Sequence, residues 1–302
     1  MRDVIPAYPP FSLSAVVESH GWVQLPPWTW DPDAGLLTRV ERLSTGRVVA
    51  LRIEAAPERS GVRVEAVDGL SETEGCEVVD KVGWMLQLDQ DLSAFYALVH
   101  DEPRLAHVPE AAKGRILRSP TLFEDTVKTI LTTNVQWSGT IRMVRALVDR
   151  FGAPLHDDLA RRAFPTPERL AAADEASLRA SGLGYRAPYV LDLARSLAAG
   201  DRDLEGLREA DLSSEDLRRE LLSIKGVGDY AAASLLMLLG RYDAVPVDSW
   251  ARTLVSREWH DGEPVGRAEV EAAFQDWGTW KGLAYWFWDW RHQTLHETIE
   301  KR

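Results

Sequence analysis

Cysteine is almost absent from this chain, which contains a single one, Cys76. One thiol excludes an intramolecular disulfide and any four-cysteine zinc or iron–sulfur site, so we expect no iron–sulfur cluster. We also expect that no cofactor is required. No apolar run approaches the length of a membrane span, and the charged, proline-broken start is unlike a signal peptide. A location in the cytoplasm, or in the nucleus if the source is eukaryotic, follows as the default, with no membrane partner. We also expect a monomer.

Positive charge is also scarce, since the chain has 35 Lys and Arg but 47 Asp and Glu, and the formal net charge is -12. This balance argues against a general, nonspecific nucleic-acid binder. Residues 113–151 depart from it, with a local excess of basic side chains that predicts either a DNA-facing strip or an ordinary solvated helix face. These basic residues are Lys113, Arg115, Arg118, Lys128, Arg142, Arg145 and Arg150.

Two different periodicities divide the 302 residues. Polar and apolar residues alternate in 37–43, 48–54 and 62–67, and Ser44-Thr45-Gly46 between the first two segments predicts a hairpin. Residues 84–88 predict a further strand, and residues 92–99 a helix. We therefore predict an α+β fold in which residues 1–112 form an N-terminal antiparallel β-rich domain. Residues 113–302 then form an all-α core of one or two lobes.

Local signals in the second part are helical. Phe123, Val127 and Ile130 fall on one face of a helix. Thr166 before Pro167 predicts a capped helix start, and so does Ser213 with Asp216 three residues later.

The stretch from 213 to 240 predicts two helices joined by Gly226-Val227-Gly228. Glycine permits a sharp reversal and lets a phosphate approach the backbone without meeting a Cβ atom. The amides of Gly226, Gly228, Asp229 and Tyr230 could then hold one phosphate, with added charge from Lys225. A glycine turn between helices is also common for structural reasons alone.

One carboxylate, Asp248, follows Val245-Pro246-Val247 and precedes a predicted helix that begins at Ser249. An aspartate in this place is often a helix cap. It can also present a charge to a ligand, and the two roles are compatible.

Together, the glycine turn and the aspartate that follows it resemble a motif of a known protein family. The segment from Ile224 to Arg252 resembles the helix–hairpin–helix, Gly/Pro-rich, aspartate motif of the HhH-GPD superfamily of base-excision DNA glycosylases. Residues 123–134, 164–173 and 183–187 also have counterparts in that family, so the resemblance covers roughly residues 115–290. The β-rich first third is similar in kind to the extra domain of the alkylbase (3-methyladenine type II) and 8-oxoguanine branches. The resemblance implies double-stranded DNA with a damaged, flipped-out base as the partner.

The resemblance also implies a role for each matching residue. Asp248 takes the place of the catalytic aspartate, which stabilises the cationic sugar that forms as the glycosidic bond breaks. Tyr230 occupies the position at which strand-cutting relatives carry a nucleophilic lysine, which implies a monofunctional enzyme without AP-lyase activity.

Further roles follow in the same way. Asn134 matches the loop position that fills the gap left by the flipped base, although a helix C-cap is an equal alternative for it. Gln136 and Trp137 are expected near the orphan base or the pocket, and Tyr230 and Trp280 match aromatic pocket positions. The residues expected to bind the DNA backbone are Lys225, Gly226, Val227, Gly228 and Asp229. The family hairpin often holds Na⁺ or K⁺ through backbone carbonyls, here those of Leu222, Ile224 and Val227.

The function implied is a monofunctional DNA glycosylase of base-excision repair that releases an alkylated purine. This substrate class rests on Tyr230 and Trp280, because aromatic faces attract cationic bases. Two alternatives stay open at this point, an 8-oxoguanine glycosylase and a noncatalytic HhH module that binds DNA.

Overall fold

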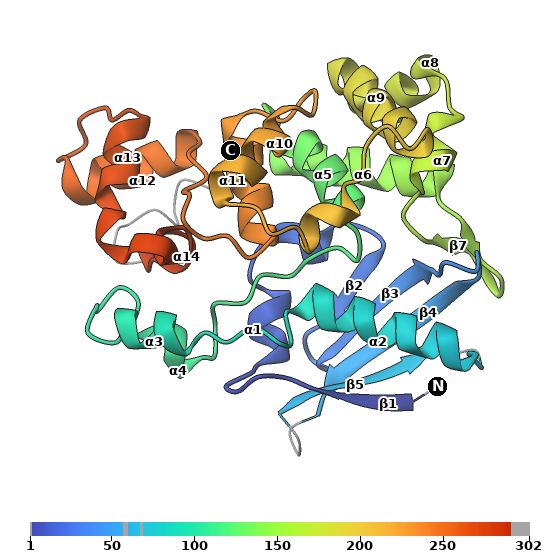
Figure 1. The fold of residues 1–302 in the computed structure, drawn as a ribbon, viewed down its shortest axis with the longest axis horizontal. Helices are drawn as coiled ribbons and strands as arrows, with labels where there is room; N and C mark the ends of the chain where they lie inside the picture. Colours follow the sequence, from blue (N-terminus) through green and yellow to red (C-terminus); the bar gives the residue numbers. More distant parts are fainter. Residues whose placement is uncertain (1, 57–59, 67–68, 291–302) are drawn as a thin grey trace.

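A computed structural model describes residues 2–56, 60–66 and 69–290. An antiparallel five-stranded sheet, in the order β1-β5-β4-β3-β2, forms the N-terminal part of the molecule (Figure 1). The strands are β1 (Arg2–Pro6), β2 (Trp28–Asp31), β3 (Leu36–Arg42), β4 (Val48–Ala55) and β5 (Gly61–Ala66). The predicted hairpin is confirmed, since Leu37 pairs with Ile53 across β3 and β4. Val67, predicted to end the last strand, lies outside the described residues.

Helices α1 (Leu13–Val17) and α2 (Glu72–Leu86) pack their apolar residues into the same core as the sheet. The strand predicted at residues 84–88 is therefore wrong, because these residues form the last turn of α2 and its C-terminal cap. Ser71 and Glu74 start this helix with a capping box, and Val78, Val82 and Met85 are buried at helical spacing. A five-residue alternation was too short to distinguish a strand from the end of a helix.

The rest of the described chain is largely helical, as predicted. Thr166 accepts a hydrogen bond from Arg169 N, and Ser213 accepts one from Asp216 N, so both predicted helix starts are confirmed. A small hairpin of β6 (Pro154–Leu155) and β7 (Asp158–Arg162) lies against β4 and β3. The principal helices are α3 (Ser93–Val99), α4 (His107–Glu110), α5 (Leu122–Thr132), α6 (Trp137–Phe151), α7 (Pro167–Ala171), α8 (Glu175–Leu178), α9 (Ala187–Ala198), α10 (Ser214–Leu222), α11 (Asp229–Leu238), α12 (Ser249–Trp259), α13 (Arg267–Ala273) and α14 (Lys281–Phe287).

The sheet and the helices share one continuous hydrophobic core that runs from Ile5 to Trp288. A buried ionic network also joins them, since Arg39 of β3 binds Glu41 at 2.8 Å and Glu124 of α5 at 2.6 Å. Lys128 binds the other oxygen of Glu124 at 2.7 Å. Burial alone would favour the neutral acid, but Arg39 and Lys128 lower the pKa of Glu124 to about 2. This network fixes α5 against the sheet, and α5 carries part of the candidate site.

The same packing corrects the interpretation of the basic strip. Arg115, Arg118 and Lys128 are buried, with exposed fractions of 1%, 5% and 0%. They hold the interior together and cannot form a continuous surface for DNA. Within the described ranges, no helix is both long enough and apolar enough to cross a membrane.

Candidate active site

The turn between α10 and α11 has the backbone that a glycine-rich reversal requires. Gly226 has φ +89°, and a Cβ atom there would lie 2.8 Å from the ring of Tyr189. Gly228 differs, because its φ is −98° and a Cβ atom there would meet no atom within 4 Å. Gly226 is therefore required by the fold, whereas Gly228 leaves the space in front of the helix open.

The first amides of α11 are free to bind an anion. No side chain caps this helix, and no group in the described ranges accepts from the N–H of Gly228, Asp229 or Tyr230. Unpaired amides at a helix N-terminus attract phosphate, and the helix dipole strengthens that attraction.

The charged side chains around this turn are already paired. Lys225 lies 3.2 Å from Asp192 and is 70% exposed, so it can still turn toward a phosphate. Asp229 binds Arg218 of α10 and, at 2.9 Å, Arg267 of α13. A carboxylate therefore stands at the start of the helix whose amides were expected to bind phosphate.

The predicted cation ligands also lie in this turn. The carbonyl of Ile224 accepts a hydrogen bond from Val227 N at 3.0 Å, which leaves one lone pair for an ion. No group of three or more His, Cys, Asp or Glu side chains in the described part of the chain is arranged to hold a metal ion. Occupation of a carbonyl site by Na⁺ or K⁺ stays a prediction.

Asp248 is the N-cap of α12, and its Oδ1 accepts from Ala251 N at 2.8 Å. It is half-buried, and no Lys or Arg in the described ranges forms an ion pair with it. Two tyrosines lie near enough to be affected by its charge. Burial, followed by the negative charge of Asp248, raises the pKa of Tyr230 and also that of Tyr285. The charge of Asp248 thus acts on Tyr230 of the hairpin helix, and one oxygen of Asp248 is not used by the cap.

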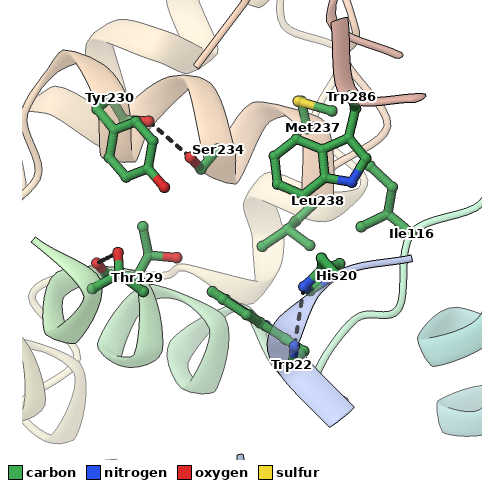
Figure 2. A pocket seen from close by; sticks show the side chains of 10 residues that line it. His20, Trp22, Ile116, Thr129, Tyr230, Ser234, Met237, Leu238 and Trp286 are labelled. Carbon is green, nitrogen blue, oxygen red and sulfur yellow. Dashed lines mark hydrogen bonds between the residues drawn. The ribbon is translucent and has the colours of Figure 1, made fainter. Parts of the chain in front are cut away.

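Tyr230 also lines a small cavity of about 40 Å³ between α5, α11, α14 and the segment at residues 20–22 (Figure 2). In this view Tyr230 and Trp286 reach in from one side, and Thr129 and Trp22 from the other. The walls are mostly aromatic and apolar. The lining residues are His20, Trp22, Ile116, Thr129, Thr132, Tyr230, Ser234, Met237, Leu238 and Trp286.

His20 contributes to this wall as a neutral ring. Its Nε2 lies 2.7 Å from the carbonyl of Leu117 and donates to it, while its Nδ1 accepts from Trp22 N at 3.2 Å. Burial lowers the pKa of His20 to about 4. The cavity therefore contains no positive charge from this side chain at neutral pH.

Trp280 does not line this cavity, contrary to the expectation from its position. Its ring stacks between Phe95, at 5.5 Å, and Tyr242, at 5.6 Å. Trp286 takes the pocket position instead, with its Nε1 donating to Ser19 O at 2.9 Å. The tryptophan-rich C-terminal stretch gave no local signal that could distinguish these two residues.

The loop between α5 and α6 presents Asn134 to solvent. Asn134 has φ +49° and follows the C-cap Thr133, so it occupies a left-handed position that asparagine tolerates. Gln136, also exposed, is the N-cap of α6. Trp137 does not line the cavity; its Nε1 donates to Gln24 Oε1 at 2.7 Å and its ring covers Gly21.

Residues 185–189 connect this loop to the hairpin. Asn134 Nδ2 donates to the Tyr185 hydroxyl at 3.4 Å, and the buried Arg186 donates to the carbonyls of Thr133 and Asn134. Tyr185, which is 47% exposed, contacts Tyr189 edge to face. Tyr189 in turn covers Gly226. Asn134, Tyr185 and the glycine turn therefore belong to one connected surface.

Comparisons with known proteins match this chain to DNA repair proteins. Residues 127–302 match the family described as HhH-GPD superfamily base excision DNA repair protein. A probable N-glycosylase/DNA lyase of Methanothermobacter thermautotrophicus is 27% identical over 224 residues, which cover 66% of this chain and 70% of that protein. The N-glycosylase/DNA lyase of Saccharomyces cerevisiae is 28% identical over 54% of this chain and 52% of its own length. The chain thus spans only about half of the yeast relative.

The fold itself has a solved counterpart. A 3-methyladenine DNA glycosylase from Archaeoglobus fulgidus aligns with a TM-score of 0.75 over 95% of this chain and 97% of that one, at 23% identity. This likeness covers the sheet as well as the helices.

Proposed function

Since this chain belongs to the HhH-GPD superfamily of base excision DNA repair proteins, we propose that it is a monofunctional DNA glycosylase that hydrolyses the glycosidic bond of an alkylated purine. The observation that carries the proposal is the placement of Asp248. One of its oxygens is not used by the helix cap, and its charge, after burial, raises the pKa of Tyr230, a residue that lines the aromatic cavity and lies in the first turn of the helix with free amides.

Each part has a task in this reaction. The amides of Gly228 and Asp229 hold a phosphate of the damaged strand, which fixes the sugar near the acid. The base leaves the stack and enters the cavity, whose walls must separate to admit a purine because about 40 Å³ holds only a few water molecules. As the bond to the base breaks, positive charge develops on the sugar, and the Asp248 carboxylate stabilises it. Water, oriented by the same carboxylate, completes the hydrolysis.

The absence of a lyase step is proposed from the residue at position 230. The archaeal and yeast relatives are named lyases, and a lyase needs an amine that can attack the sugar. Here the hairpin helix presents Tyr230, and no lysine is among the side chains that line the cavity. Lys128 is fully buried and paired with Glu124, which removes it from this role.

The substrate class is proposed from the cavity walls. Aromatic faces and methyl groups dominate, and His20 is neutral. Such walls attract a cationic ring without repelling its charge. They offer few groups that could recognise a neutral oxidised base by hydrogen bonds.

The test is a base-release assay on duplexes that each carry one lesion, such as 7-methylguanine, hypoxanthine or 8-oxoguanine. We expect release of the alkylated base by the wild type and no adduct after borohydride reduction. Asp248→Asn should reduce the rate by about 10²–10³-fold. Its melting temperature should be unchanged because asparagine also caps helices well. Failure of the wild type to release any lesion would favour the noncatalytic DNA-binding alternative, and preferential release of 8-oxoguanine would replace the substrate assignment.

A further inference from the structure

Trp22 and His20 form the part of the cavity wall that comes from the N-terminal part of the chain. Trp22 lies in the short 3₁₀ turn η1 (Gly21–Gln24), is 8% exposed, and faces the interior across from Tyr230 (Figure 2). Trp286 Nε1 donates to a backbone carbonyl, but Trp22 Nε1 has a different kind of partner. It donates at 2.7 Å to Oδ1 of Asp125, a carboxylate with an exposed fraction of 1%.

The polar groups around the cavity are almost all used within the protein. Both nitrogens of His20 and the indole nitrogens of Trp22 and Trp286 are hydrogen-bonded. Ser234 and Thr132 donate their hydroxyls to backbone carbonyls. The Tyr230 phenol interacts with the side chains of Ser234 and Thr132. What remains is the Thr129 hydroxyl, which has no partner in the described part of the chain. A base that enters this cavity therefore meets ring faces more than hydrogen-bonding groups.

Asp125 places a carboxyl group at the edge of one of those rings. Burial raises the pKa of Asp125, whereas Ser119, Lys128 and Trp22 favour its charged form. Its Oδ1 also accepts from Ser119 N at 3.0 Å, so two N–H donors hold the carboxylate in place. Lys128 and Glu124 are its charged neighbours, and Lys128 is itself shared with Glu124. A carboxylate bound to an indole N–H increases the electron density of the ring and thereby its attraction for a cation over its face.

We propose that Asp125 is a positioning and specificity-determining residue that acts through Trp22, and that this pair makes the cavity prefer a cationic base over a neutral base of similar size. The inference rests on the proposed function, because it assumes that a base enters this cavity. It goes further by assigning discrimination to a buried carboxylate that never touches the DNA.

The experiment measures affinity, so that it does not depend on base release. Duplexes carry one 2′-fluorinated nucleotide, which resists cleavage, bearing either cationic 7-methylguanine or neutral hypoxanthine. The readout is the ratio of the two dissociation constants for each variant. Asp125→Asn is the central variant, because its Oδ1 can still accept from Trp22 and Ser119 while the charge is lost.

We expect Asp125→Asn to reduce the preference for the cationic base about three- to thirtyfold, with little change for hypoxanthine. Trp22→Phe keeps a ring but removes the N–H, so it should lower the preference by itself. In the Trp22→Phe variant, the further substitution Asp125→Asn should not reduce the preference any more. Glu124→Gln is the matched control: it removes an equally buried neighbouring carboxylate that binds Arg39 and Lys128, and it should lower stability but keep the ratio.

Two results would overturn the inference. The ratio could stay at its wild-type value in Asp125→Asn, even if both lesions bind more weakly, as a purely structural role would predict. Asp125→Asn could also reduce the preference for the cationic base just as much in the Trp22→Phe variant as in the wild type. If Asp125→Asn fails to fold, Trp22→Phe breaks the same contact from the other side and decides the question. Absence of base release by the wild type would refute the proposed activity and leave these affinities interpretable.

Discussion

The two glycines of the α10–α11 turn predict opposite outcomes for the same substitution. In Gly228→Ala the new methyl group meets no protein atom within 4 Å, and the backbone, with φ −98°, is one that alanine adopts freely. Alanine is a slightly poorer N-cap than glycine, but it also restricts the unfolded chain, so stability should change by less than about 1 kcal/mol. The methyl group points into the space that a phosphate would occupy.

The effect on binding can be worked out from the amides. Charge-assisted hydrogen bonds contribute about 1.5–3 kcal/mol, so losing the phosphate contact should raise the Kd for duplex roughly ten- to hundredfold. Damaged and undamaged duplexes should be weakened alike, because the turn contacts only the backbone.

Gly226→Ala, two residues earlier in the same turn, is the control for Gly228→Ala, because it should affect stability. At φ +89° an L-residue costs about 1–2 kcal/mol, and overlap with the Tyr189 ring adds about 1–3 kcal/mol. This variant should melt several degrees below the wild type. Fluorescence anisotropy with labelled duplex and thermal unfolding measure both quantities. A Gly228→Ala protein that binds normally, or that loses affinity for one lesion only, would refute the phosphate-cradle reasoning.

Other predictions concern charge, packing and pH. Asp229→Asn should lower the Kd for undamaged duplex about fivefold at low salt, because a carboxylate paired with Arg267 no longer opposes the phosphate; a weaker or unchanged affinity in a salt titration would contradict this. Trp280→Ala should cost about 3 kcal/mol of stability by unstacking Tyr242, without changing which lesion is preferred in the release assay. His20 takes up a proton near pH 6.5 when unfolded but only near pH 4 when folded. The free energy of unfolding should therefore fall by up to about 3 kcal/mol as the pH drops through that window. Urea unfolding of wild type and His20→Gln at pH 7 and 5 should show a smaller fall in the variant.

The features that the sequence predicted well are local ones. A cap such as Ser213, the reversal at Gly226 and the N-cap position of Asp248 depend on a few neighbouring residues, so their geometry follows from residue type. The antiparallel sheet followed by helices was predicted for the same reason, since alternation and helical spacing are short-range patterns.

The cavity could not be predicted in this way. His20 and Trp22 have no motif around them, and they reach α5 and α11 only because the whole core forms. Trp286 and Trp280 lie in one tryptophan-rich stretch, and only tertiary packing decides which ring enters the cavity. Lys128 belongs to a basic strip by composition, yet Glu124 draws it into the interior.

The hydrogen bond from Trp286 to the carbonyl of Ser19 joins residues near the two ends of the described chain, so one is synthesised early and the other late. During synthesis the early segment leaves the ribosome long before α14 exists, and the wall that holds Trp22 must wait for its opposite side. A growing chain can therefore already possess the glycine turn and its amides while it has no finished place to receive a base. The cavity can therefore be completed only after α14 has been synthesised.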